Sequence, residues 1–266
     1  YNCKLSRKGF KIAHINIQSL RYKVDNVRIL LADNHIDILC ITETWLENSI
    51  GNNELQIDGY TIHRLDRHHK DHGGILFYVK DGIVFKEKPD LQCTGIEALW
   101  IELNLPFTKP ILLGTVYRPP DSKAEYIEKL DSLFQSTTSS YDDVVIVGDF
   151  NQDISKHCYS TKINKLSNHS NLSQLIKDFT RITETTKSIL DLAFLSKAEK
   201  VSCSGVHSTG LSDHSLIYLV RKNKKVKVPP KLIKSRSFKN FSEHKFIDTI
   251  KNSNWNDVFD KLNVDD

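Results

Sequence analysis

The chain has 266 residues, of which 39% are hydrophobic and 26% charged, so it can bury a sizeable core without disulfide or metal staples. Its net charge of +4 is uneven, because residues 221–266 carry 12 Lys and Arg against 6 Asp and Glu, which leaves residues 1–220 at −2. No apolar run approaches the roughly 18 residues that cross a bilayer, which excludes membrane-spanning helices as a basis for function.

Strand and helix patterns follow one another along the chain. In order, they predict a strand over 10–17, a helix over 24–34, strands over 36–42, 60–64, 74–79, 98–103 and 111–117, a helix over 123–135, a strand over 144–147, a short helix over 171–177, and strands over 190–195 and 215–220. The helices are too widely spaced for regular βαβ repetition. We therefore predict an α/β fold, a four-layer α/β sandwich in which two mixed β-sheets pack face to face with helices outside.

The C-terminal part differs in composition from the rest. Seven basic residues and no acidic ones lie between Arg221 and Lys234, interrupted by Pro229-Pro230. Such a segment can lie along a phosphate backbone or serve as a solvated tether, and the sequence favours neither. We predict a folded domain over residues 1–221 and a basic linker region over 222–266.

Two features of the chain bear on its setting. The five cysteines are far apart and odd in number, which predicts reduced thiols in an intracellular protein. The chain starts at Tyr1 and contains no methionine, so we expect it to be part of a longer polypeptide.

Polar residues collect at the ends of the predicted strands. Buried carboxylates need a partner or a metal, and the ends of strands on one edge of a sandwich converge. The candidates are Asn16, Glu43, Asp149, Asn151, Asp191, Asp213 and His214. Oxygen ligands of this kind suit a hard divalent cation such as Mg²⁺ and fit phosphoryl transfer. Individually, each residue could also be structural, as a turn cap or an Asp–His hydrogen bond.

Taken in order, these residues carry a family resemblance. The series Asn16 with Gln18, Glu43, Tyr117, Gly148-Asp149-Phe150-Asn151, Asp191 and Ser212-Asp213-His214 resembles the endonuclease/exonuclease/phosphatase superfamily over residues 10–220. Within it, Tyr117-Arg118-Pro119-Pro120, Thr180-Arg181, Asp191-Leu192-Ala193-Phe194 and the basic tail resemble the endonuclease of LINE-type, jockey-like non-LTR retrotransposons. In those elements the endonuclease domain precedes a reverse transcriptase.

The resemblance implies a role for each residue. It makes Glu43, Asn16 and Gln18 the metal site for Mg²⁺, with Mn²⁺ as a substitute. It makes Asp149 the residue that activates water, while Asn151, Tyr117 and His214 contact the phosphate, Asp213 orients His214 and Asp191 supports the site. The expected DNA contacts are Arg118, Thr180, Arg181, His72 and Ser212.

The function implied is a Mg²⁺-dependent endonuclease that nicks one strand of double-stranded DNA. The nick would leave a 3′-hydroxyl primer for a downstream reverse transcriptase in the same polypeptide. We expect the protein to act as a monomer in the nucleus and to bind no membrane. Two alternatives stay open: an abasic-site repair endonuclease or another phosphodiesterase or phosphatase of the superfamily, and a catalytically silent DNA-binding module.

Overall fold

The computed structural model describes residues 5–47, 49–67, 72–224 and 238–255. The chain divides into two compact units, residues 1–228 and 229–266. In the second unit, helix α5 (Glu243–Asn252) begins after Ser242, whose hydroxyl oxygen accepts a hydrogen bond from the backbone N–H of Lys245. Most of the predicted basic linker lies outside the described residues.

The first unit contains two six-stranded mixed sheets. Sheet A has the strand order β13-β14-β1-β2-β4-β3, and sheet B has the order β5-β6-β7-β8-β12-β9. Each sheet holds one parallel pair, β1 with β2 and β7 with β8, among antiparallel neighbours. Sheet A consists of β1 (Phe10–Asn16), β2 (Ile38–Thr42), β3 (Tyr60–Leu65), β4 (Ile75–Lys80), β13 (Val201–His207) and β14 (Leu216–Arg221). Sheet B consists of β5 (Val84–Glu87), β6 (Glu97–Asn104), β7 (Ile111–Tyr117), β8 (Val144–Asp149), β9 (Ser173–Gln174) and β12 (Asp191–Leu195).

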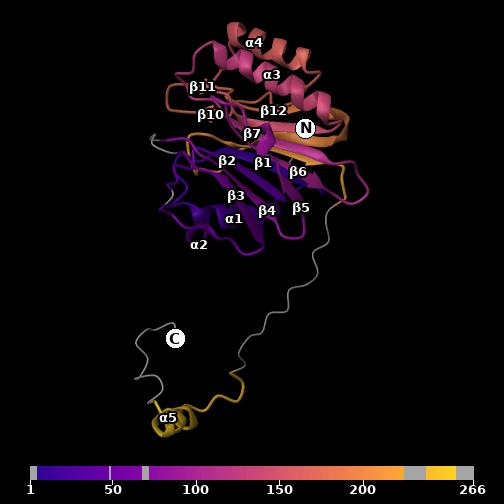
Figure 1. The fold of residues 1–266 in the computed structure, drawn as a ribbon. Coiled ribbons are helices and arrows are strands. Elements are labelled where there is room, and N and C mark those ends of the chain that lie inside the picture. Colours follow the sequence, from indigo (N-terminus) through magenta and orange to yellow (C-terminus); the bar gives the residue numbers. More distant parts are fainter. Residues whose placement is uncertain (1–4, 48, 68–71, 225–237, 256–266) are drawn as a thin grey trace. The chain divides into compact units, whose positions relative to one another are not determined.

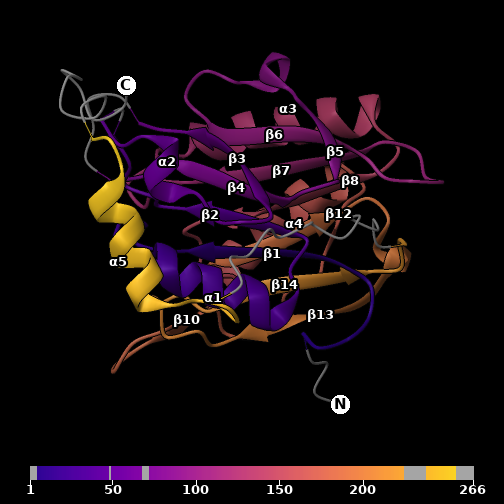
Figure 2. The same cartoon turned by 90° about the horizontal axis from the view of Figure 1, so that it is seen from below.

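Helices cover the outer faces of both sheets (Figures 1 and 2). Helices α1 (Val24–Asn34) and α2 (Asn52–Leu55) lie outside sheet A, and α3 (Glu125–Ser140) and α4 (His157–His169) lie outside sheet B. The predicted four-layer sandwich is confirmed.

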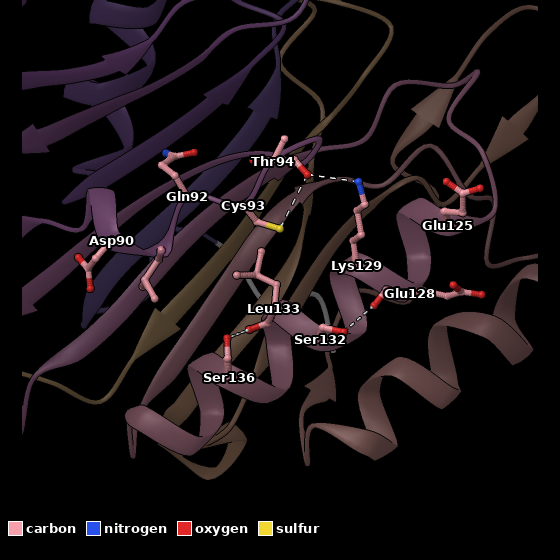
Figure 3. A pocket seen from close by; sticks show the side chains of 11 residues that line it. Asp90, Gln92, Cys93, Thr94, Glu125, Glu128, Lys129, Ser132, Leu133 and Ser136 are labelled. Atoms are coloured by element: carbon pink, nitrogen blue, oxygen red, sulfur yellow. Dashed lines mark hydrogen bonds between the residues drawn. The ribbon is translucent and has the colours of Figure 1, made fainter.

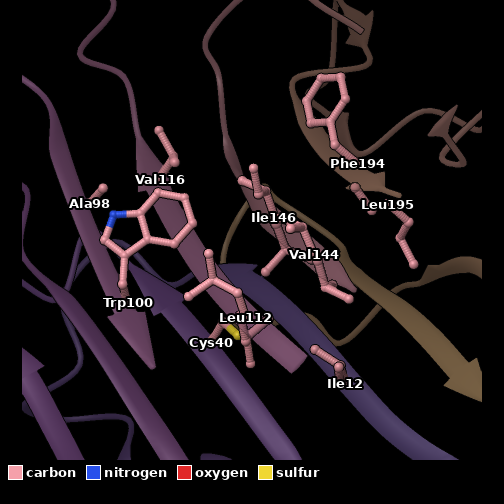
Figure 4. Close-up of a cluster of buried hydrophobic side chains, with 14 of the residues drawn as sticks. Ile12, Cys40, Ala98, Trp100, Leu112, Val116, Val144, Ile146, Phe194 and Leu195 are labelled. Atoms are coloured by element: carbon pink, nitrogen blue, oxygen red, sulfur yellow. The ribbon is translucent and has the colours of Figure 1, made fainter. Parts of the chain in front are cut away.

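Side chains that alternate along β1 explain how one strand serves two cores. Phe10 and Ile12 belong to the cluster between the sheets, whereas Ala13 and Ile15 pack in the cluster under α1. Figure 4 shows part of the cluster that contains Ile12, which also includes Trp100 and Phe194 of sheet B. This cluster extends to the α3 side of sheet B, where Phe194 meets Phe134. His14 and Asn16 continue the Ile12 face toward the end of the strand.

The structure corrects the short helix predicted over 171–177. Ser173 and Gln174 form β9, which pairs with Leu195 and Phe194 of β12, and the helix of this region is α4. The sequence pattern also missed β5, β13 and the hairpin strands β10 (Arg181–Ile182) and β11 (Lys187–Ser188). These strands are short or partly exposed, so they carry little apolar alternation.

Two further observations concern the setting of the chain. No helix among the described residues is both long and apolar enough to cross a membrane. Cys40 and Cys93 are free thiols, but Cys203 is disulfide-bonded, so the expectation that every thiol is reduced is wrong for this residue.

Candidate functional site

The two sheets bring the ends of several strands to one edge of the sandwich. In sheet A, Asn16 at the end of β1 is in register with Thr42 at the end of β2. In sheet B, Asp149 at the end of β8 is in register with Tyr117 on β7 and with Asp191 at the start of β12. Backbone pairing therefore gathers polar residues that are far apart in the sequence.

Asn16 links the two sheets through its side-chain amide. Its Nδ2 donates to Oε1 of Glu43 at 2.7 Å and to Oδ2 of Asp149 at 2.8 Å. One amide thus bridges two carboxylates that would otherwise repel each other. Its Oδ1 accepts from the backbone N–H of Gln18 at 3.3 Å, so Gln18 contacts this group through its backbone.

The backbone around Glu43 adopts conformations that non-glycine residues seldom occupy. The φ angles of Gln18, Glu43, Trp45 and Asn151 are +48°, +54°, +52° and +46°. The Nε1–H of Trp45 donates to Oε2 of Glu43 at 3.2 Å, and its ring meets that of His72 edge to face with centroids 4.5 Å apart. Unfavourable backbone angles of this kind cluster at functional sites, where tertiary contacts hold them.

Asn151 and Asp149 form one hydrogen-bonded turn. The backbone N–H of Asn151 donates to Oδ1 of Asp149 at 2.9 Å, and its Nδ2 donates to the carbonyl of Arg118 at 2.8 Å. A Cβ at Gly148 would lie 1.9 Å from the carbonyl oxygen of Val116. The glycine therefore permits the close approach of β8 and β7 that places Asp149.

Burial controls the charge state of Asp149. Burial raises the pKa of Asp149 to about 7, and the charge of Asp191 acts in the same direction, against the opposing effect of His214. A carboxylate with such a pKa can accept a proton near neutral pH.

His214 is oriented by Asp191, which corrects the role predicted for Asp213. Nδ1 of His214 lies 2.8 Å from Oδ2 of Asp191, whereas Nε2 lies 3.9 Å from the nearest oxygen of Asp213. Asp213 accepts instead from Nε of Arg181 at 2.7 Å. Burial alone would lower the pKa of His214, but the charge and hydrogen bond of Asp191 raise it to about 9. The imidazole is therefore cationic at neutral pH.

Tyr117 reaches Glu43 from sheet B. Burial raises its pKa, and so do the charge of Glu43 and a hydrogen bond with that carboxylate. The guanidinium of Arg67 lies 5.4 Å from the centre of the Tyr117 ring, and its Nε donates to Glu97 at 2.6 Å. The phenol thus keeps its proton and can donate a hydrogen bond.

His14 stands in no motif of the sequence and was not among the predicted site residues. This residue is fully buried beside the site, with Nδ1 3.6 Å from Oδ1 of Asp191 and Nε2 3.1 Å from Oγ1 of Thr42. Burial lowers its pKa to about 4, against the opposing charge of Asp191. The period of two along β1 could have revealed it, because His14 shares its face with Asn16.

Of the residues predicted to contact DNA, two are buried, and a third, Ser212, is half-buried and bonded to the protein. The guanidinium of Arg118 is buried and donates to the carbonyls of Ser122 at 2.9 Å and Asn151 at 3.3 Å. The hydroxyl oxygen of Thr180 accepts from the backbone N–H groups of residues 190 and 191. Ser212 donates to the carbonyl of Asn16 at 2.6 Å. Arg118 and Thr180 are corrected to structural residues because burial leaves them no surface for a phosphate, and Ser212 holds the strand ends together.

Arg181 and His72 remain accessible. The side chain of Arg181 is 40% exposed at the base of the β10–β11 hairpin, and Ile182 beside it is 49% exposed. Thr183 and Thr186 close the hairpin turn with a hydrogen bond of 2.9 Å from the backbone N–H of Thr183 to the Thr186 carbonyl. His72 is exposed next to Trp45.

The donor set fits a divalent metal ion. Glu43 and Asp149 present carboxylate oxygens on either side of the Asn16 amide, and burial raises the pKa of Asp149 despite its hydrogen bonds from Asn16 and Asn151, so a nearby cation would favour its ionised form. Hard cations prefer such oxygen donors. Asp149, Asp191 and His214 also form a cluster whose ligand atoms lie within 4.8 Å of one another. In the described conformation, the proton on His214 and its bond to Asp191 oppose metal binding at that imidazole.

A pocket of about 870 Å³ lies elsewhere, between the segment from Asp90 to Thr94 and helix α3 (Figure 3). Glu125, Glu128 and Lys129 line it, and Lys129 donates to the carbonyl of Thr94 at 3.3 Å. None of the predicted site residues lines this pocket.

Comparisons with known proteins agree with this geometry. The model of the endonuclease/exonuclease/phosphatase family matches residues 13–214. The search of curated proteins found no match. Among solved structures, the endonuclease domain of TRAS1, a telomere-specific non-LTR retrotransposon, is similar with a TM-score of 0.67 at 15% identity, over 82% of this chain and 100% of that one.

Two DNA-processing enzymes are also similar in structure. A 3′ phosphatase from Neisseria bound to a product DNA hairpin has a TM-score of 0.62 at 17% identity, over 80% of this chain and 99% of that one. An AP endonuclease from Archaeoglobus fulgidus has a TM-score of 0.59 at 17% identity, over the same shares of the two chains. At these identities the likeness concerns the fold.

Proposed function

Because the chain belongs to the endonuclease/exonuclease/phosphatase family, we propose that it is a metal-dependent DNA endonuclease that nicks one strand of double-stranded DNA. The observation that carries this proposal is the Asn16 amide, which joins Glu43 of one sheet to Asp149 of the other, opposite the Asp191–His214 pair. Carboxylates, an amide and an imidazolium at one edge suit hydrolysis of a phosphodiester.

Each side chain has a chemical task in this proposal. Glu43, with Asn16 and Gln18, would hold Mg²⁺ or Mn²⁺, which supplies Lewis-acid stabilisation of charge on the phosphate when bound. Asp149 orients the attacking water and accepts its proton, a task that fits a pKa of about 7.

The phosphate itself is held by donors. The imidazolium of His214 donates from Nε2 to a phosphate oxygen, because Asp191 occupies Nδ1. Tyr117 would donate from its hydroxyl in place of its bond to Glu43, and Asn151 from its Nδ2 in place of its 3.3 Å bond to Asp149. Arg181 and His72 provide the accessible contacts to flanking DNA.

We further propose that the nick leaves a 3′-hydroxyl that primes a downstream reverse transcriptase in the same polypeptide. The resemblance to LINE-type endonucleases and the structural likeness to the TRAS1 domain support this role. In this proposal residues 222–266 lead from the endonuclease toward that enzyme, the endonuclease acts as a monomer, and it works in the nucleus.

The main alternative stays within the family. The AP endonuclease and the 3′ phosphatase that share the fold favour repair of abasic sites or of blocked 3′ ends as a second candidate. A silent DNA-binding module is the less favoured alternative, because the chemical positions hold competent residue types.

The test is nicking of supercoiled plasmid with Mg²⁺, with Mn²⁺ and with EDTA. We expect open circles only with metal, and a loss of at least about 10³-fold in rate for Glu43→Ala and His214→Ala. Asp149→Ala should abolish nicking and leave DNA binding largely intact. If the folded wild type leaves plasmid supercoiled but cuts an abasic duplex, the repair function replaces the proposed one.

A further inference from the structure

His14 is a buried histidine to which the proposed chemistry assigns no task. It precedes Asn16 by two residues on β1, so both side chains point into the space between the sheets. Its Nδ1 lies 3.6 Å from Oδ1 of Asp191, and Oδ2 of the same carboxylate lies 2.8 Å from Nδ1 of His214. One buried carboxylate therefore lies between two imidazoles.

The atoms that face each other here have no other hydrogen-bond partner within the described ranges. Nδ1 of His14 and Oδ1 of Asp191 are both buried and make no hydrogen bond, while the same carboxylate also interacts with the Thr180 side chain. Buried polar groups are rarely left without a partner, since losing water without a replacement is costly. A separation of 3.6 Å leaves no room for a bridging water and is only slightly longer than a hydrogen bond.

The surroundings of His14 select which ring nitrogen carries the proton. Nε2 lies 3.1 Å from Oγ1 of Thr42, a hydroxyl that can donate or accept. A proton on Nε2 would leave the lone pair of Nδ1 facing the oxygen of Asp191, which is repulsive. With the proton on Nδ1, Thr42 donates to Nε2 and Nδ1–H faces the carboxylate at 3.6 Å, which is longer than a hydrogen bond but electrostatically attractive.

We propose that His14 is a positioning residue whose Nδ1–H holds Asp191, so that Asp191 in turn holds the His214 imidazole toward the phosphate. Its effect on DNA cleavage rests on the proposed endonuclease function. In this series of contacts, His14 holds Asp191, and Asp191 holds Nδ1 of His214, so that Nε2–H of His214 faces the phosphate. His14 itself does not contact the substrate. Residues that orient a reacting group in this way typically change rate by about 10- to 100-fold when lost.

The first test is the tautomer of His14 in the wild-type protein. Long-range ¹H–¹⁵N spectra of protein labelled with ¹⁵N-histidine distinguish a protonated Nδ1 from a protonated Nε2, and the signals missing from His14→Asn assign them. We expect the Nδ1–H form. An Nε2–H form would overturn the proposal whatever the enzymatic activity is.

The second test uses variants in the nicking assay. His14→Leu removes the donor, and we expect kcat to fall on the order of 10-fold with KM unchanged. His14→Asn keeps an N–H near the position of Nδ1 and should recover kcat to within about 3-fold of the wild type. His63→Leu is the matched control, because His63 lies in the same sheet on β3, where it pairs with Glu87, and it should leave kcat unchanged.

The outcomes separate positioning from packing. If His14→Leu nicks at the wild-type rate, or if both His14 variants lose activity equally while the His214 signals stay in place, the proposal is overturned. If His14→Leu does not fold, as judged by circular dichroism, the proposal is tested by the tautomer of the wild-type protein and by the nicking rate of His14→Asn. A folded wild type that does not nick refutes the proposed function. The positioning role is then decided by the tautomer and by His214 signals that are displaced in His14→Leu but not in His14→Asn.

Discussion

Replacing Asp191 by Asn tests the charge that keeps His214 cationic. The variant retains size and shape but removes the carboxylate that lies 2.8 Å from Nδ1. The rise in the pKa of His214 from 6.5 to about 9 corresponds to about 3 kcal/mol of stabilisation of the imidazolium. Without Asp191, burial is the main remaining influence, so the pKa should fall to its ordinary value or below.

The sign of the pH dependence follows from this shift. His214 must be protonated to donate to the phosphate, so wild-type nicking should fall as the pH rises through about 9. In Asp191→Asn the same loss should occur near pH 6.5 or lower, and at pH 7.5 no more than about a tenth of the imidazole stays protonated. Asp149 must be ionised, so wild-type activity rises with pH through about 7 or lower, since bound metal favours the carboxylate.

The assay is the initial nicking rate between pH 5.5 and pH 10, with circular dichroism as the check on folding. Asp213→Asn is the matched control, because Asp213 lies 3.9 Å from Nε2 and pairs with Arg181. Its alkaline limb should move much less. An alkaline limb that stays near pH 9 in Asp191→Asn would refute the role given to Asp191.

Three further predictions concern other parts of the chain. Gly148→Ala should lower the free energy of unfolding in urea by about 3 kcal/mol, because its Cβ would meet the Val116 carbonyl at 1.9 Å; an unchanged midpoint contradicts that close approach. Arg118→Ala should lower stability by roughly 2 kcal/mol without changing the salt dependence of DNA binding, whereas Arg181→Ala should reduce the salt slope by about 1. If Arg118→Ala reduced the salt slope of DNA binding as much as Arg181→Ala does, Arg118 would be a DNA-contacting residue after all. Replacing Lys224, Lys225 and Lys227 together by Ala should weaken DNA binding and flatten its salt dependence. An unchanged salt slope would show that the tail is a tether.

The candidate site residues were accessible from the sequence because they end or begin apolar strands. Asn16, Glu43 and Asp149 stand where a buried run stops, and a polar residue there needs a partner. The apolar run over 144–147 also predicted β8, and amphipathic spacing predicted α1 over its full length. These features are local, so residue order is enough to show them.

Pairings between distant residues were not accessible in this way. Asp213 is the neighbour of His214 in sequence, yet the antiparallel pairing of β12 with β8 brings Asp191 to Nδ1 instead. Arg118 and Thr180 have types that bind phosphate, yet both are buried by contacts that only the folded loops create. His14 belongs to no sequence motif, and only its distance to Asp191 in the folded protein indicated a role for it.

By itself the sequence determined where the long buried strands lie and which polar residues follow or precede them, because these properties depend on side chains close together in the chain. Only the tertiary structure decided which carboxylate faces which imidazole and which cations are buried. Hydrogen bonds depend on distances of a few tenths of an ångström, and sheet packing sets those distances between segments more than a hundred residues apart, as for Asn16 and Asp149.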